Sequence, residues 1–149
     1  MRTLLLCVLA LCSHVMSMTA QVTGRIEYPY RADYEDQLVL PIGDKGLVIQ
    51  SFAKDSKAGK RYFKTELYST MMTPVSTDSM LIDKGMYYYS NIVDNGVLYT
   101  VLRESDGTFM IVAFNATTHK ITVTDGEYTR KGTMRNLIIS NDNVVFSSI

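Results

Sequence analysis

The chain has 149 residues, 46% of them hydrophobic, so it is long enough to bury the core of one domain. Its 15 basic and 15 acidic residues cancel, which argues against binding to nucleic acid or to acidic membranes by net charge. Both cysteines, Cys7 and Cys12, lie near the start, so the rest of the chain has neither a disulfide framework nor a thiolate ligand.

Residues 1–20 have the three-part pattern of a secretory signal peptide. Arg2 supplies the positive charge, residues 4–12 are apolar, and small residues follow at Ser17 and Ala20. The pattern predicts cleavage after Ser17 or Ala20, with Ala20 slightly preferred. It places the mature protein in the periplasm, at the cell surface or outside the cell. The apolar run is shorter than the roughly 20 residues of a transmembrane helix, so no membrane span is expected after signal removal.

Three alternatives to a cleaved signal stay open: an uncleaved membrane anchor, a lipoprotein signal and a buried N-terminal helix. A leucine rather than a small residue precedes each cysteine, which does not fit the lipoprotein pattern. Residues 21–36 then form a leader rich in tyrosine and charge. Within it, residues 25–30 are either a strand that completes a later sheet or part of a flexible segment.

From residue 37 onward, short apolar runs alternate with turn signals, a pattern typical of β-strands. None of the runs shows a sustained helical period, so we expect no helix after the signal. The runs cover residues 38–42, 47–52, 62–68, 86–93, 97–102, 109–114, 121–124, 137–139 and 144–146.

The turn signals recur in a fixed relation to these runs. Turns rich in Asp, Asn and Gly begin at Asp44, Asp94 and Asn141, each between two apolar runs. The segments that follow the first two turns can be overlaid, residues 46–50 on 96–100, residues 62–70 on 109–117 and residues 74–77 on 121–124. A longer polar link then leads to the next apolar run. The repeat therefore has four strands.

The repeat predicts four-stranded antiparallel blades of a β-propeller, with about two and a half blades present. We assign residues 37–83 to blade one, 84–131 to blade two and 132–149 to an incomplete third blade. A β-sandwich is the alternative fold. Because open blade faces would be exposed, we expect the isolated chain to self-associate and to be the N-terminal fragment of a longer protein.

The segments 92–99, 109–118 and 120–123 carry a resemblance. They resemble blades of kelch-like and quinoprotein-like propellers, and exported uncharacterised proteins of Bacteroides-type bacteria. The resemblance covers residues 37–149 and implies a propeller architecture. The chain has no Trp, which WD40 blades use, and no double glycine of the kelch type. Residues 105–109 are similar to a sialidase Asp-box but lack its spacing, so no named propeller family is matched.

Four groups of residues are candidate sites. A basic cluster, Lys54, Lys57, Lys60, Arg61 and Lys64, is either a polyanion contact or a solvated loop, with the loop favoured. Residues 87–89, three tyrosines, either pack between blades or line a channel and stack on a sugar, with packing favoured. His119 reads as a turn residue, and residues 115–117 fit a glycosylation sequon.

The sequence nominates no catalytic residue, no metal ligand and no cofactor, and it leaves the ligand-binding residues unknown. One histidine after the signal cannot build a zinc site or a triad. We therefore predict a binding or scaffold module for a protein, peptide or glycan ligand, not an enzyme in this chain alone. The alternatives are the propeller portion of an exported peptidase or glycosidase, with catalytic residues elsewhere, and a fragment without function.

Overall fold

A computed structural model describes residues 32–55, 57–127, 134–140 and 143–148 of the chain. These residues form two four-stranded antiparallel sheets and one two-stranded hairpin, with no α-helix among them, so the all-β prediction is confirmed. The expected signal peptide at residues 1–20 and the strand considered at residues 25–30 lie outside the described residues.

Each four-stranded sheet is a simple meander in which neighbouring strands are consecutive in the chain. The first sheet contains β1 (Tyr34–Pro41), β2 (Leu47–Ala53), β3 (Lys60–Tyr68) and β4 (Pro74–Asp83), with a 3-10 turn, η1 (Gly43–Lys45), between β1 and β2. The second contains β5 (Tyr87–Asp94), β6 (Val97–Arg103), β7 (Thr108–Asn115) and β8 (Lys120–Glu127). The hairpin contains β9 (Met134–Ser140) and β10 (Asn143–Ser148).

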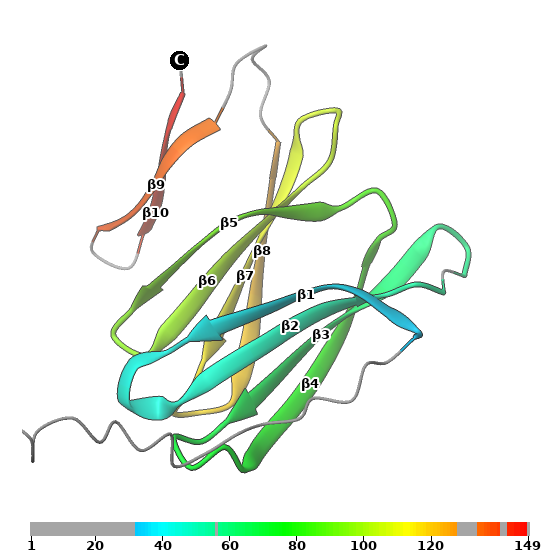
Figure 1. Cartoon of the computed structure of the whole chain (residues 1–149). Coiled ribbons are helices and arrows are strands. Elements are labelled where there is room, and N and C mark those ends of the chain that lie inside the picture. Colours follow the sequence, from blue (N-terminus) through cyan, green and yellow to red (C-terminus); the bar gives the residue numbers. More distant parts are fainter. Residues whose placement is uncertain (1–31, 56, 128–133, 141–142, 149) are drawn as a thin grey trace, which may run out of the picture.

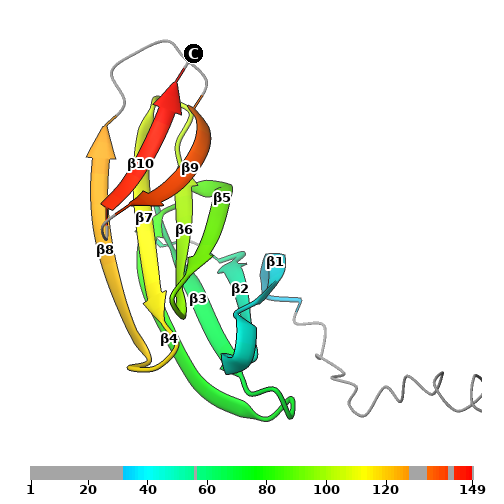
Figure 2. The same ribbon diagram turned by 90° about the vertical axis from the view of Figure 1, so that its left-hand side faces the viewer.

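The three groups of strands are stacked in layers. Figures 1 and 2 show the second sheet between the first sheet and the β9–β10 hairpin. In Figure 1, β1 and β5, the first strands of their sheets, run in the same direction.

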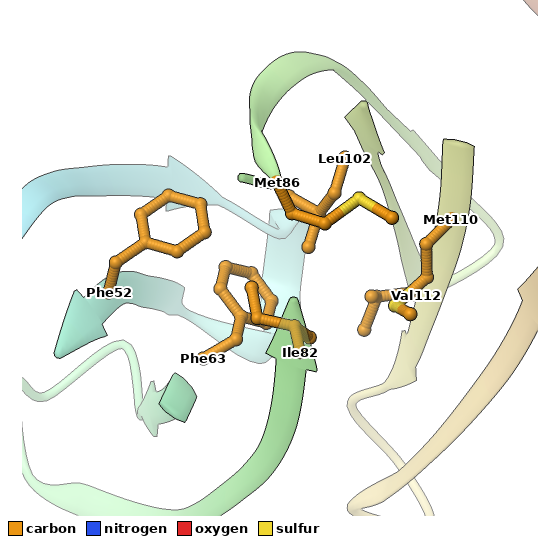
Figure 3. Packing of buried hydrophobic residues seen from close by; sticks show 7 residues of the cluster. All are labelled: Phe52, Phe63, Ile82, Met86, Leu102, Met110 and Val112. Atoms are coloured by element: carbon orange, nitrogen blue, oxygen red, sulfur yellow. The ribbon is translucent and has the colours of Figure 1, made fainter. Parts of the chain in front are cut away.

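The hydrophobic core lies between the two four-stranded sheets. One cluster joins Phe52, Phe63 and Ile82 of the first sheet to Leu102, Met110 and Val112 of the second, with Met86 between them (Figure 3). A second cluster joins Val48 and Leu67 to Leu98 and Phe114, together with Ile42 and Ala116. Phe52 and Phe63 are fully buried, with ring centroids 5.1 Å apart. Burial of these large side chains is the main force that holds the two sheets together.

The strands extend beyond the apolar runs that predicted them. β1 begins at Tyr34, inside the segment assigned to the leader, and β4 continues to Asp83 through residues expected to be a polar link. The outer strands of a sheet expose much of their surface, so strand residues there need not be apolar. Most residues of β4 are exposed, which is why an apolar pattern did not mark its full length.

The two predicted turns that fall in the described residues differ in length. Asn95 and Gly96 both have positive φ and form a tight two-residue turn between β5 and β6. The equivalent connection in the first sheet is longer, since Pro41 pairs with Leu47 and residues 42–46 lie between them. The third predicted turn includes residues 141–142, outside the described residues.

The sequence overlay pairs Gln50 with Thr100, and in the structure these two side chains meet across the core. The Thr100 hydroxyl donates a hydrogen bond to the Gln50 side-chain oxygen at 2.8 Å. The overlay does not, however, match the two sheets face for face. The bond from Ile42 N to Gly46 O sets the β1–β2 ladder so that the Gln50 N–H is turned toward β1. The bond from Ala116 N to Gly96 O turns the Thr100 N–H toward β7 instead.

Which neighbour a residue's N–H faces decides the sheet face from which its side chain projects. Gln50 and Thr100 therefore project from non-equivalent faces of their sheets. When β2 and β6 are matched face for face, the residue of β6 that corresponds to Gln50 is therefore an odd number of positions away from Thr100. The difference in connection length between residues 42–46 and residues 95–96 accounts for this shift.

Candidate functional site

The pocket that we consider as the candidate site lies at the end of the first sheet, beside the connection between β2 and β3. Its volume is about 490 Å³, within the range typical of small-molecule sites. Its lining comes from the end of β2, the connection, the start of β3 and the end of β4. The lining residues are Ala53, Asp55, Lys57, Ala58, Lys60, Arg61, Tyr62 and Leu81.

An apolar floor is formed by Tyr62 and Leu81, which are directly opposite each other on β3 and β4. Cross-strand partners project from the same sheet face. Here that face is the one turned away from the second sheet, because Phe63 and Ile82, their sequence neighbours, point into the core. Tyr62 is 50% exposed and Leu81 is 56% exposed, so both present apolar surface to a ligand.

A tight turn at Ala58 and Gly59 forms one wall of the pocket. Lys57 and Lys60 flank this turn and exchange both backbone hydrogen bonds, at 2.9 and 3.1 Å. Ala58 has a φ of 52°, a left-handed conformation that costs about 1 kcal/mol or more for a residue other than glycine. The turn is held to the next connection by a bond from Lys84 N to Gly59 O at 2.8 Å.

Four residues of the pocket lining are charged: Asp55, Lys57 and Lys60, which are exposed, and Arg61, which is buried. The Lys60 ammonium lies 2.7 Å from an Asp83 carboxylate oxygen, and both side chains are about half exposed. Lys57 and Asp55 are exposed. Solvent can therefore reach the charged groups of Asp55, Lys57 and Lys60, whereas the Arg61 side chain is buried.

The basic cluster predicted from the sequence does not act as one surface. Arg61 is buried and faces the second sheet, where its guanidinium lies 2.6 Å from Glu35 and donates to the carbonyl of Met86. Its central carbon also lies 4.2 Å from the centroid of the Phe52 ring. Arg61 therefore connects β1, β3 and the link between the sheets, which is a structural role.

Lys64 is also buried, on the opposite face of β3. Its ammonium lies 2.8 Å from Glu66, and both side chains are less than 10% exposed. The same ammonium lies 5.4 Å from the centroid of the Tyr34 ring, within cation–π range. Of the five predicted residues, Lys57 and Lys60 line the pocket through exposed side chains, and Arg61 belongs to the lining although its side chain is buried. Lys64 is internal, and Lys54 is outside the pocket lining.

The three tyrosines at residues 87–89 are separated by a β-bulge, so the simple alternation expected for them is interrupted. Tyr88 packs against the core cluster, and Tyr87 is 42% exposed. Burial raises the pKa of the Tyr88 hydroxyl, and the hydrogen bond that it accepts from Asn91 partly offsets this. The ring of Tyr89 lies 5.7 Å from the Arg103 guanidinium. These contacts agree with packing rather than with a shared stacking surface.

His119 lies in the turn between β7 and β8 with a φ of 57°, and its side chain is exposed. In the same turn, the Asn115 side-chain oxygen accepts hydrogen bonds from the N–H groups of Thr117 and Thr118, both at 2.9 Å. Within the described ranges, no group of three or more His, Cys, Asp or Glu side chains is placed to hold a metal ion.

The sequence did not identify the pocket, although two signals in it point there. Lys60 and Tyr62 are two residues apart on β3, which places them on one face, and Gly59 between Lys57 and Lys60 is a turn residue. Leu81 could not be assigned to the same site, because its strand was predicted to end before it.

Comparison of the chain with models of protein families, with curated proteins and with solved structures found no match. Among the described residues, the structure contains no helix with the length and apolarity needed to cross a membrane.

Proposed function

We propose that this chain is an exported binding module built from propeller-type blades, with its ligand site in the pocket beside Tyr62 and Leu81. The single observation that carries the proposal is the composition of this pocket. An exposed aromatic and aliphatic floor lies next to charged groups at the end of a rigid sheet. Binding sites on β-scaffolds commonly combine such an apolar surface with a few polar groups from loops.

The stacking of the sheets supports the blade interpretation. Val48 and Leu98 belong to one core cluster, and Phe52 and Leu102 belong to the other. The early residues of β2 and β6 therefore lie together, as do the later ones, so the two strands run in the same direction across the core. Non-equivalent faces meet, as the backbone ladders indicate. When strands of two stacked sheets run in the same direction and non-equivalent faces meet, one sheet can be superposed on the other without being turned over. Adjacent propeller blades have this relation.

The position of the third layer also agrees with blades. The described contact between the hairpin and the second sheet is between β9 and β5, the first strands of their groups. In a propeller the first strands of successive blades lie next to one another around a common axis. A β-sandwich accommodates the two main sheets equally, but it gives no reason for this contact between first strands.

The two architectures differ in a measurable way. In a crystal structure of the protein recovered from its host, blades would be arranged around an axis that runs beside β1, β5 and β9. Parallel layers without such an axis would establish the sandwich and refute the blade interpretation, while leaving the pocket to be tested separately.

Binding is tested by NMR titration of the exported, isotope-labelled chain with three classes of probe: neutral oligosaccharides, acidic oligosaccharides and short peptides. We expect at least one class to shift resonances of the pocket residues, with Tyr62 and Leu81 among them, and to be recovered unchanged. If no class shifts these residues, or if a probe is cleaved, the binding-module proposal is wrong. The hydrolase alternative stays a prediction, since it requires catalytic residues outside this chain.

A further inference from the structure

The rim of the pocket contains two like charges directly opposite each other. Lys57 and Lys60 form a cross-strand pair closed by two backbone hydrogen bonds, so their side chains leave the same face. Like charges in this arrangement destabilise a hairpin. The turn that holds them adds the strain of a left-handed alanine at Ala58. Unfavourable local features of this kind concentrate at functional sites.

Asp83 offsets only part of this charge. Its carboxylate contacts Lys60 at 2.7 Å, and no ion pair to Lys57 is present among the described residues. A carboxylate from a ligand, seated between the two ammonium groups, would complete the neutralisation. Because both ammonium groups are solvent-accessible, they would not have to be desolvated from a buried ion pair first.

The apolar floor lies on the same face as the two lysines. Lys60 and Tyr62 are two residues apart on β3, and Leu81 is the cross-strand partner of Tyr62. An anionic group held by the lysines therefore places the rest of the ligand over the Tyr62 ring. Asp55, which also lines the pocket, offers carboxylate oxygens that accept hydrogen bonds from ligand hydroxyl groups.

Resting on the proposed function, we infer that the pocket binds a saccharide that carries a carboxylate. The sugar ring packs on Tyr62 and Leu81, its carboxylate lies between Lys57 and Lys60, and its hydroxyl groups donate to Asp55. A saccharide fits better than an acidic peptide, because the combination requires one anionic group, a flat apolar ring face and hydroxyl donors within a single pocket of about 490 Å³.

The test uses trigalacturonate, its fully methyl-esterified form and a tetra-aspartate peptide as probes, with isothermal titration calorimetry on the full exported chain. We expect trigalacturonate to bind, the ester to bind at least about tenfold more weakly, and the peptide not to bind measurably. Raising the salt concentration should weaken trigalacturonate binding, because the contact between charges is exposed.

Two substitutions separate the parts of the site. Lys57→Glu should abolish trigalacturonate binding and leave the melting temperature unchanged or raised, since it replaces a like-charge pair with an opposite-charge pair. Tyr62→Ala should weaken binding about tenfold or more through loss of the ring contact. The matched controls are Lys45→Glu, whose side chain is 42% exposed at the η1 turn, and Tyr87→Ala, whose residue is 42% exposed on β5.

The outcomes distinguish this inference from the proposed function. If the ester binds as tightly as the acid, or if the peptide binds instead through Tyr62, the carboxylated saccharide is refuted while the binding module stands. If none of the probes binds but another saccharide or peptide shifts Tyr62 in the NMR titration, this inference alone fails. If Lys57→Glu and Lys45→Glu weaken binding equally, the lysine pair does not hold the carboxylate.

Discussion

Thr100 and Gln50 are 50 residues apart in the chain and are joined by a hydrogen bond of 2.8 Å at the centre of the core. Both residues are fully buried, one on each of the two stacked sheets. The amide group of Gln50 also lies 3.5 Å from the Thr65 hydroxyl, on the neighbouring strand. A polar contact of this kind, in an otherwise apolar layer, favours one alignment of the two sheets over alternatives shifted along the strands.

Substitution of Thr100 by Val tests this contact. The change keeps the shape of the side chain but leaves the buried Gln50 oxygen without its donor, so we expect a loss of about 1–3 kcal/mol in the free energy of unfolding. Urea denaturation measures it. The control is Thr122→Val on β8, where the threonine is exposed. Equal losses in the two variants would show that the contact contributes nothing of its own.

Arg61 gives a second prediction, because its cation is internal whereas that of the adjacent Lys60 is at the surface. We expect Arg61→Met to lower the free energy of unfolding by about 2 kcal/mol. This is less than the roughly 3–5 kcal/mol lost when a fully buried ion pair is broken, since solvent reaches its partner Glu35, which is 43% exposed. Lys60→Met breaks an exposed pair and should change stability by less than about 1 kcal/mol. Thermal denaturation measures the stability of both variants. A larger loss of stability for Lys60→Met than for Arg61→Met would contradict the internal role of Arg61.

In the connection between β1 and β2, Gly46 should be harder to replace than Gly43. A side chain at Gly46 would place Cβ 2.0 Å from the Tyr68 carbonyl oxygen, whereas one at Gly43 would meet nothing within 4 Å. Both glycines have positive φ. We expect Gly43→Ala to cost about 1 kcal/mol from backbone strain alone. Gly46→Ala should cost at least about 2 kcal/mol more, because backbone must shift. Similar melting temperatures for the two variants would refute this difference.

The lowered pKa of Asp106 leads us to expect that the stability of the fold depends on pH. Its carboxylate accepts a hydrogen bond from the Thr108 N–H at 2.8 Å, and this bond lowers the pKa of the carboxyl group. A group with a lowered pKa in the folded state stabilises the fold above its ordinary pKa, and this contribution disappears as pH falls through the folded value.

The variant Asp106→Asn keeps an acceptor oxygen but does not titrate. We therefore expect the wild-type protein to lose its advantage over Asp106→Asn as the pH falls below about 4. Calorimetric melting temperatures across this interval provide the measurement. A difference between the two proteins that stays constant with pH would mean that the ionised carboxylate is not preferred by the fold.

The all-β class and the four-stranded groups could be predicted because alternating apolar runs and Asp/Asn-Gly turns are local signals. Asn95 and Gly96 illustrate this, since their positive φ angles are what that dipeptide favours. The length of β4 could not be predicted. Its residues 78–83 pair with β3 through the backbone, and backbone pairing at a sheet edge leaves little trace in side-chain polarity.

The pocket could be predicted only in part. Lys57, Lys60 and Tyr62 are close in sequence, and strand alternation places the last two on one face. The difference between Arg61, which enters the core, and Lys60, which remains at the surface, depends on the direction in which the whole sheet faces. That direction is set by packing against the second sheet, which involves residues of β6 and β7 such as Leu102 and Val112 that lie far from the pocket residues in the sequence.

The bond from Lys84 N to Gly59 O joins the turn that carries both lysines to residues 84–86, the segment that passes from the first sheet to the second. At the end of this segment the Met86 side chain is buried in the core, and Arg61 contacts its carbonyl. Any molecule that immobilises the turn therefore also restrains residues 84–86, the segment that connects the two sheets. Occupancy of the pocket should slow hydrogen exchange at the Lys84 amide, so this amide can serve as an internal reporter of binding that does not itself line the pocket.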